Sequence, residues 1–270
     1  MMNRRQTLAL LALGSSAAAT TQPLHAQGDP AAPAAPVTQP PQTAAVAAIA
    51  AQPIPPFSNA PLGATLAPGW EPQRLPKVLR ANAFVIVADG ERRVLRIHSA
   101  QSASSWVSRL NVNAAQRPWL HWQWKVSHAL AGSDLRSKGG DDYAARLYVF
   151  FDLPSEQLSL TDRLQLAAAR ALSGADLPAA ALCYVWGDTQ PVGVSAWNPY
   201  TDRVRMIVLD NHETVVNQWH SHARDLRRDW VQSFGGPMPR VSGVAVSADT
   251  DNTGDTVDAW FGDVRLEAGP

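Results

Sequence analysis

The stretch GDDYAARLYVFF, residues 140–151, decides the fold class of this chain. Its apolar side chains recur at every second position, namely Tyr143, Ala145, Leu147, Val149 and Phe151. The positions between them include Asp142, Arg146 and Tyr148. Because successive side chains of a β-strand point to opposite faces, this pattern predicts a strand with one face in the core and a polar face opposite.

Similar patterns recur along the chain. In residues 119–127, Leu120, Trp122, Trp124 and Val126 alternate with His121, Gln123 and Lys125. The dipeptide Asp89-Gly90 joins two apolar runs, 84–88 and 93–99, and is typical of a tight hairpin turn. We expect further strands at 181–187, 203–209, 241–248 and 258–266.

This order of elements indicates the architecture. Strands separated by turns, without alternating helices, predict a mainly β chain, folded as a two-layer antiparallel β-sandwich of the jelly-roll type. One or two short helices are expected to interrupt it, since residues 159–172 and 224–234 carry apolar side chains at helical spacing.

The N-terminal part differs in composition from the rest. Residues 1–26 contain Arg4 and Arg5, an apolar run and an Ala-rich exit, which is typical of an export signal; the ordinary and twin-arginine routes both remain open. Residues 27–56 are rich in Ala and Pro and are predicted to be a disordered linker. Residues 57–270 then form one β-sandwich domain, expected to be periplasmic or secreted. No later apolar run is long enough to anchor it in a membrane.

Charge and cysteine content narrow the possible partners. Lys plus Arg and Asp plus Glu number 23 each, so the formal net charge is zero, and nucleic acid is not expected as a partner. The single cysteine, Cys183, lies in an apolar run and is expected to be a small buried hydrophobe.

The first candidate site is polar and aromatic. Asp142 and Arg146 are expected on one strand face, either to bind a polar ligand or to form structural ion pairs, for example with Lys138 or Arg205. Trp186 is expected in the core, whereas Trp197 is equally compatible with the core and with stacking on a sugar ring. The candidate ligand-binding residues are Lys138, Asp141, Asp142, Arg146, Trp197, Asn198, Tyr200, Arg203 and Arg205.

The second candidate site is acidic and follows an expected strand. Asp249, Asp251, Asn252 and Asp255 offer the clustered oxygen atoms that Ca²⁺ requires, although such residues also form turns through bonds to their own backbone. His220 and His222 would share a strand face and are a weaker metal candidate. Since both acidic clusters lie where strands meet loops, we expect them to form one polar site. Its carboxylates should bind Ca²⁺ or pair with Arg146, Arg203 or Arg205, because uncompensated buried charge is costly.

Several motifs of this chain resemble the family of domain of unknown function 3047. They are residues 138–149, Leu182-Cys183-Tyr184-Val185-Trp186, Asn198-Pro199-Tyr200-Thr201, Arg203-Val204-Arg205-Met206 and residues 249–253. The likeness runs from about Trp70 to Leu266. It implies an exported bacterial protein and brings no activity or catalytic residues. The closing stretch, residues 259–266, is also similar to the last strand of galactose-binding-like and carbohydrate-binding jelly rolls.

Three functions are compatible with these observations. The first is an exported β-sandwich that binds a polar ligand such as an envelope or extracellular glycan, without catalysis. The second is a polysaccharide hydrolase or lyase that uses Asp142 with Asp249 or Asp251. The third is a structural envelope protein whose aromatic side chains all belong to the core. Aromatic residues along an open groove would favour the first, and two carboxylates facing each other across it the second.

Overall fold

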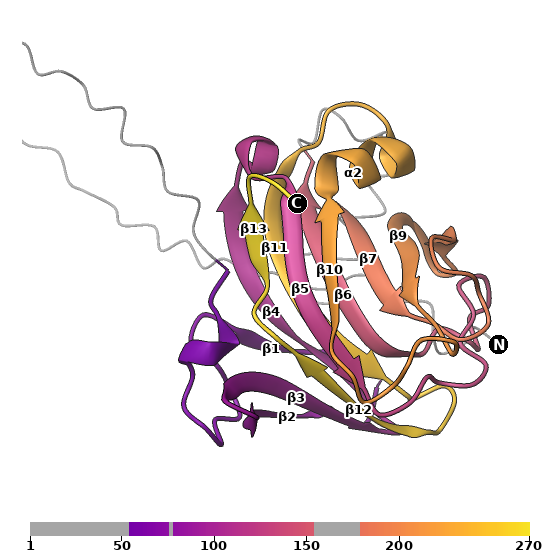
Figure 1. Cartoon of the computed structure of the whole chain (residues 1–270). Helices are drawn as coiled ribbons and strands as arrows, with labels where there is room; N and C mark the ends of the chain where they lie inside the picture. Colours follow the sequence, from indigo (N-terminus) through magenta and orange to yellow (C-terminus); the bar gives the residue numbers. More distant parts are fainter. Residues whose placement is uncertain (1–53, 76–77, 154–178) are drawn as a thin grey trace, which may run out of the picture.

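The computed structural model describes residues 54–75, 78–153 and 179–270. Two sheets face each other as a sandwich (Figure 1), which confirms the predicted fold class. The first is seven-stranded, and its strands in spatial order are β1 (Glu71–Arg74), β4 (Ala103–Val112), β11 (Arg240–Asp249), β6 (Tyr143–Asp152), β7 (Ala180–Trp186), β9 (Thr201–Asp210) and β8 (Ser195–Asn198).

The second sheet is six-stranded. Its main path follows β10 (His220–Asp225), β5 (Trp119–Val126), β12 (Thr256–Phe261), β3 (Arg92–Ala100) and β2 (Ala83–Asp89), and β13 (Arg265–Glu267) also pairs with β5. Helix α2 (Leu226–Phe234) follows β10, and two short 3₁₀ turns are η1 (Phe57–Asn59) and η2 (Ala114–Gln116). Asp225 begins α2 by accepting hydrogen bonds from the backbone N–H groups of Arg227 and Arg228, which have no partner inside the helix.

The core lies between the sheets and follows the predicted alternation. Trp122 and Trp124 of β5 are buried, and their rings meet edge to face with centroids 5.6 Å apart. Trp186 of β7 is buried against Trp124 across the sandwich, at 6.2 Å. These contacts confirm the core assignment of all three indoles. Cys183 is also buried, and burial raises the pKa of its thiol to about 12.

The face assignment of Tyr143 was wrong. Ser247 pairs with Arg146 and Asp249 pairs with Tyr143, so between these pairs β6 has one residue more than β11. This bulge turns Tyr143 away from the sandwich core, and its ring lies under the guanidinium of Arg146, with the carbon of that group 4.4 Å from the ring centroid. Beyond the bulge, Ala145, Leu147, Val149 and Phe151 belong to the core as predicted.

Other details also differ from the expectations. The pair β7·β9 is parallel, so the sandwich is not wholly antiparallel. The stretch 258–266 forms two strands, because residues 262–264 leave the sheet between β12 and β13. Arg224 and Asp225 end β10, so the helix expected from 224 begins at Leu226. Strands β1, β4 and β8 were not predicted, and β10 was indicated only by the strand face expected for His220 and His222. The expected helix 159–172, the export signal and residues 27–53 of the linker lie outside the described residues.

Candidate functional site

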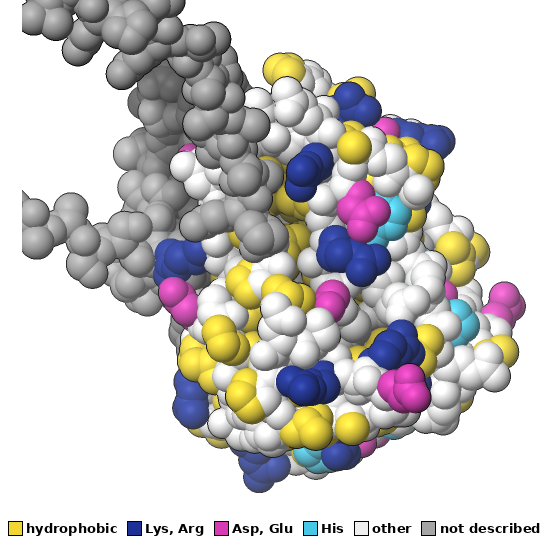
Figure 2. Space-filling model, turned by 60° about the vertical axis from the view of Figure 1, so that its left-hand side comes forward, with side chains coloured by type: hydrophobic (Ala, Val, Ile, Leu, Met, Phe, Trp, Pro, Cys, Tyr) yellow, Lys and Arg dark blue, Asp and Glu magenta, His cyan; other side chains and the backbone are white. Residues whose placement is uncertain are grey.

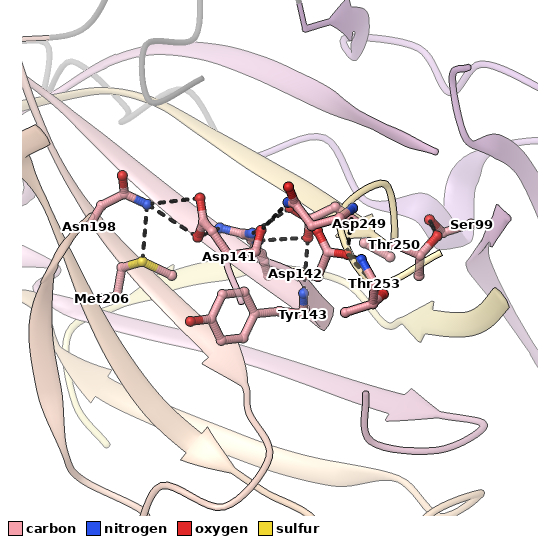
Figure 3. A network of polar contacts seen from close by, with 12 residues as sticks. Ser99, Asp141, Asp142, Tyr143, Asn198, Met206, Asp249, Thr250 and Thr253 are labelled. Atoms are coloured by element: carbon pink, nitrogen blue, oxygen red, sulfur yellow. Dashed lines mark hydrogen bonds and ion pairs between the residues drawn. The ribbon is translucent and has the colours of Figure 1, made fainter. Parts of the chain in front are cut away.

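Arg146 is the centre of a buried network on the outer face of the seven-stranded sheet. Figure 3 shows Asp141 and Asp249 of this network, with its polar contacts as dashed lines. Its guanidinium, which is only 2% exposed, forms a two-point ion pair with Asp249 of β11, with Nε to Oδ1 at 2.7 Å and Nη2 to Oδ2. Nη1 donates to Asp141 Oδ1 at 3.1 Å and to the Tyr148 hydroxyl at 3.2 Å, and Nη2 donates to the Asp141 carbonyl at 2.6 Å. The five N–H bonds of the group are thus directed at partners from two strands and a loop.

Asp142 holds the loop that follows β11. Its Oδ2 accepts hydrogen bonds from the backbone N–H of Asn252 at 2.9 Å and from the N–H and hydroxyl of Thr253 at 2.6 and 2.9 Å. Its Oδ1 accepts from the Asn252 side chain at 2.7 Å. The expectation that Asp142 and Arg146 share one strand face was therefore wrong, since Asp142 precedes the strand and the bulge separates them. The two acidic clusters nevertheless meet, because Asp141 and Asp249 contact the same guanidinium.

The electrostatics of this network follow from its burial. Loss of hydration raises the pKa of Asp249 and of Asp141, and the charge of Arg146 offsets part of the effect. A cavity of about 20 Å³ lies among Asp141, Arg146, Asn198 and Asp249. This volume admits roughly one water molecule. The network therefore has no space for a sugar ring.

The carboxylates that lie close enough to hold a cation differ from the set expected from the sequence. Among the described residues, Asp142, Asp249 and Asp251 each offer one carboxylate oxygen within 4.8 Å of the others. Asp255 is outside this group, and its carboxylate accepts from the N–H of Thr256 at 2.6 Å and lies 3.5 Å from His128 Nε2. A cation at the group would compete with Arg146 for Asp249 and with the 252–253 loop for Asp142. Binding of Ca²⁺ stays a prediction.

The remaining candidates of the first site are divided between the network and its surroundings. The amide of Asn198 donates to both oxygens of Asp141, each at 3.3 Å. Lys138 Nζ lies 5.2 Å from the ring centroid of Tyr200 and forms no ion pair with Asp142 in the described part of the chain. In the residues that the structure describes, Lys138 and Arg205 do not form the expected ion pairs, whereas Arg146, which was also expected to pair with the acidic clusters, is the partner of Asp141 and Asp249.

The edge hairpin of β8 and β9 carries the other three. Trp197 is 37% exposed and packs between Arg205, 5.0 Å from its ring centroid, and Phe234 of α2, at 5.2 Å. Arg205 also donates to the Ser195 hydroxyl at 2.8 Å, and Arg203 to the Ala179 carbonyl at 3.1 Å. Whether any of these residues binds a ligand stays a prediction.

A second polar region lies on the outer face of the six-stranded sheet, and we call it the open-face groove. Its volume is about 650 Å³. Hydrogen-bonding side chains from several strands and turns line it, among them Arg92, Arg93, His121, Gln123, Ser221 and Arg265. Figure 2 shows one face of the molecule, on which basic, acidic and histidine side chains are interspersed around hollows in the surface.

The six-stranded sheet is curled beside the groove, where Arg92 packs on Trp219. Lys125 Nζ of β5 lies 3.0 Å from Asp89 Oδ2 of β2, although β12 and β3 lie between these strands. The indole N–H of Trp219, just before β10, donates to the same oxygen at 2.5 Å. The sheet therefore bends toward this face, so that side chains from its two edges meet above it.

Sequence reasoning missed the open-face groove as a site. The available signal was the polar face of residues 119–127, where His121, Gln123 and Lys125 alternate with the core indoles. His220 and His222, the weaker metal candidate, pack against core indoles, although His222 also lines the groove. His222 Nε2 lies 2.7 Å from Asp210 Oδ2, and His220 Nε2 lies 2.7 Å from the Val215 carbonyl, so the two rings have different partners.

Comparison with solved structures finds β-sandwich proteins at low identity. The family 30 carbohydrate-binding module of the Clostridium thermocellum cellulase Cel9D-Cel44B is 13% identical, with 81% of this chain and 94% of the module covered and a TM-score of 0.35. The xyloglucanase domain of NopAA from Sinorhizobium fredii is 9% identical, covering 77% and 96%, with a TM-score of 0.38. A cellulase derived from Cel12A of Rhodothermus marinus is 13% identical, covering 75% and 94%, with a TM-score of 0.40.

Sequence comparison is more specific. No curated protein sequence matches the chain. In the described residues, no helix is long and apolar enough to cross a membrane. The model of the family described as protein of unknown function DUF3047 matches residues 68–265, which include both sheets almost entirely. The chain therefore belongs to the DUF3047 family.

Proposed function

We propose that this protein is an exported, non-catalytic binder of a glycan, which lies in the open-face groove. The observation that carries the proposal is the groove itself, about 650 Å³ in volume and lined by side chains that donate or accept hydrogen bonds. Ligand sites generally have volumes of about 300–1,000 Å³. Sugar hydroxyl groups both donate and accept, so a mixed lining of guanidinium, amide, imidazole and hydroxyl groups suits them.

The lining side chains are held in place before any ligand arrives. Gln123 donates to the Ser221 hydroxyl at 2.8 Å, and Arg92 donates to Gln123 Oε1 at 2.6 Å. Gln123 and Ser221 face each other on the paired strands β5 and β10. A row of side chains on a rigid sheet loses little conformational entropy when a ligand binds, which supports a binding role.

The Arg146 network supports the hydrolase or lyase alternative less well. Catalysis on a glycosidic bond needs two carboxylates on either side of that bond. Asp142 and Asp249 are buried and already accept hydrogen bonds or an ion pair with both oxygens. The adjoining cavity has room for roughly one water molecule.

Binding can be tested with the purified domain. Isothermal titration against a panel of bacterial envelope and extracellular oligosaccharides should identify a ligand, and Gln123→Ala should weaken its binding by about tenfold or more. Gln73→Ala is the matched control, because Gln73 lies on edge strand β1 of the other sheet. Absence of binding across the panel, or equal binding by the Gln123→Ala variant, would favour the structural envelope role instead.

Export needs a separate test. Mass spectrometry of fractionated cells should find a mature N-terminus near Gln27 outside the cytoplasm, because residues 1–26 have the composition of a cleaved signal. Changing Arg4 and Arg5 to Lys should stop export if the twin-arginine route is used, and leave it unaffected if the ordinary route is used. A chain that retains Met1 in the cytosol would contradict export.

A further inference from the structure

We infer that the open-face groove selects glycans that carry carboxylate groups, and that Arg92 is the residue that recognises them. This inference rests on the proposed glycan-binding function. It starts from the charged residues along the groove, which are three guanidinium groups, Arg92, Arg93 and Arg265, and two carboxylates, Glu91 and Asp263. The ion pairs and hydrogen bonds of these groups decide which charges remain available to a ligand.

Arg92 and Arg93 make only neutral hydrogen bonds within the described residues. Arg92 donates to Gln123, and Arg93 Nη1 lies 3.4 Å from the Ala60 carbonyl. Neither forms an ion pair with a carboxylate of the described residues, in contrast to Arg96, which forms a two-point pair with Asp258 at 3.0 and 3.1 Å. Two guanidinium groups therefore keep their capacity for an anionic partner.

Two other charged residues of the groove, Asp263 and Arg265, have partners within the protein. Asp263 Oδ1 accepts from the backbone N–H of Ser58 at 3.0 Å, and Oδ2 accepts from its hydroxyl at 2.7 Å, so both oxygens are engaged. Arg265 pairs with Glu267 at 3.0 Å and is therefore compensated outside the lining. Glu91 and Asp263 equal Arg92 and Arg93 in number, and the charge of Arg92 also lowers the pKa of Asp89, so the groove has no net positive charge. Within the described residues, however, neither guanidinium group forms an ion pair, so both keep N–H groups that can donate to an anionic ligand.

Arg92 is also held in a fixed orientation. The carbon of its guanidinium lies 4.7 Å from the ring centroid of Trp219, and Gln123 fixes one of its nitrogen atoms. Trp219 is itself fixed by its hydrogen bond to Asp89. A planar guanidinium that is stacked on an indole presents its remaining N–H groups in one plane, which matches the two oxygens of a carboxylate. Uronic acid residues of a glycan offer such carboxylates.

The inference is tested with pairs of ligands that differ in the charge of the carboxyl group and in one methyl group per residue. Tetragalacturonate and tetramannuronate, each as the free acid and as the methyl ester, are titrated into the wild-type domain. We expect a free acid to bind about tenfold or more tighter than its ester, since only the ionised carboxylate forms charge-assisted hydrogen bonds with the guanidinium. This preference should decrease when ionic strength rises from about 0.01 M to about 0.15 M.

Variants then assign the preference to one residue. Arg92→Gln should abolish the difference between acid and ester, and Arg92→Lys should retain only part of it, because Lys keeps the charge and loses the planar fork. Arg240→Gln is the matched control, since Arg240 contacts Asn111 on the other sheet. Melting curves check that all three variants are folded.

The outcomes separate the two proposals. Equal binding of acid and ester, or a preference that survives Arg92→Gln, overturns the inference and leaves glycan binding intact. If none of the four probes binds while a neutral glycan of the wider panel does, the inference fails and the proposed function stands. If no glycan binds at all, both fail.

Discussion

The two charged regions of this sandwich contain the same kinds of side chain, but only one of them is buried and paired within the protein. On the seven-stranded sheet, the guanidinium of Arg146 is buried and is bound by Asp141 and Asp249. On the six-stranded sheet, the guanidinium of Arg92 is exposed at a groove, where an amide and an indole hold it. The first region is complete without a ligand, whereas the second has N–H groups left to donate.

This difference teaches that a conspicuous charge cluster is a poor guide to a binding site until its burial is known. A charge that is removed from water must be paired within the protein, because an unpaired buried charge costs several kcal/mol. An exposed charge carries no such requirement, since water solvates it in the absence of a ligand. The charged motif at residues 140–151 therefore supports the fold, and the polar face of β5 is the better candidate for binding.

The largest expected effect comes from removing the buried guanidinium. Arg146→Met should destabilise the domain by about 3–5 kcal/mol, because it leaves the carboxylates of Asp141 and Asp249 buried without their cation. Urea unfolding measures this change. Arg96→Met, on the six-stranded sheet, is the matched control. The half-exposed ion pair of Arg96 with Asp258 should contribute less than about 1 kcal/mol to stability. Similar costs for both variants would remove the contrast between the two regions.

A smaller effect is expected at the loop that Asp142 holds. Asp142→Ala removes the acceptor of the backbone N–H groups of Asn252 and Thr253, and should cost about 2–3 kcal/mol. Asp255→Ala is the control in the same loop region, because this carboxylate is exposed and accepts from its neighbour Thr256. Equal urea midpoints of the two variants would show that the loop does not depend on Asp142.

The pH dependence of stability should have opposite signs at two buried carboxylates. Burial raises the pKa of Asp141, so its unfavourable contribution grows as pH rises from the unfolded value towards the folded one. At Asp210, burial also opposes ionisation, but hydrogen bonds from His222 and Trp124 outweigh it and lower the pKa. Its favourable contribution is present above the unfolded pKa and is lost as pH falls through the folded pKa.

Asn variants measured by urea unfolding across the acid range test these signs. Relative to wild type, Asp141→Asn should gain stability as pH rises, and Asp210→Asn should gain as pH falls. Parallel slopes for the two variants would contradict the assignment of the causes.

The smallest expected effect is that of Ca²⁺. The carboxylates of Asp142 and Asp249 already have protein partners on both oxygens, so a cation gains little by displacing them. We expect the chelator EDTA and added Ca²⁺ to leave the melting temperature unchanged. If EDTA lowered the melting temperature and Ca²⁺ restored it, the carboxylates around Arg146 would instead be a cation site.

Local patterns of the sequence were sufficient for much of the fold. The alternation of Trp122 and Trp124 with polar residues placed β5 and its buried face correctly, because one residue's face in a strand determines that of its neighbours. The Asp89-Gly90 dipeptide correctly predicted the β2–β3 hairpin, because the turn preference of two residues is also a local property. Strands β1 and β8 were missed, since four residues with mixed polarity carry too little pattern. The ten-residue β4 was missed as well, and β10 was indicated only by the expectation that His220 and His222 share a strand face.

What the sequence by itself determined, then, is the fold class and the residues of its core, because periodicity and burial act between near neighbours. The sequence also indicated that the two acidic clusters meet, but only the tertiary structure decided how their charges are paired. The bulge opposite Ser247 and Asp249 turned Tyr143 outward and placed Arg146 next to Asp249, about a hundred residues away in sequence. The curl of the six-stranded sheet likewise brought Arg92 to Gln123 and Trp219. Such contacts depend on the register and curvature of paired strands, and no local pattern specifies either.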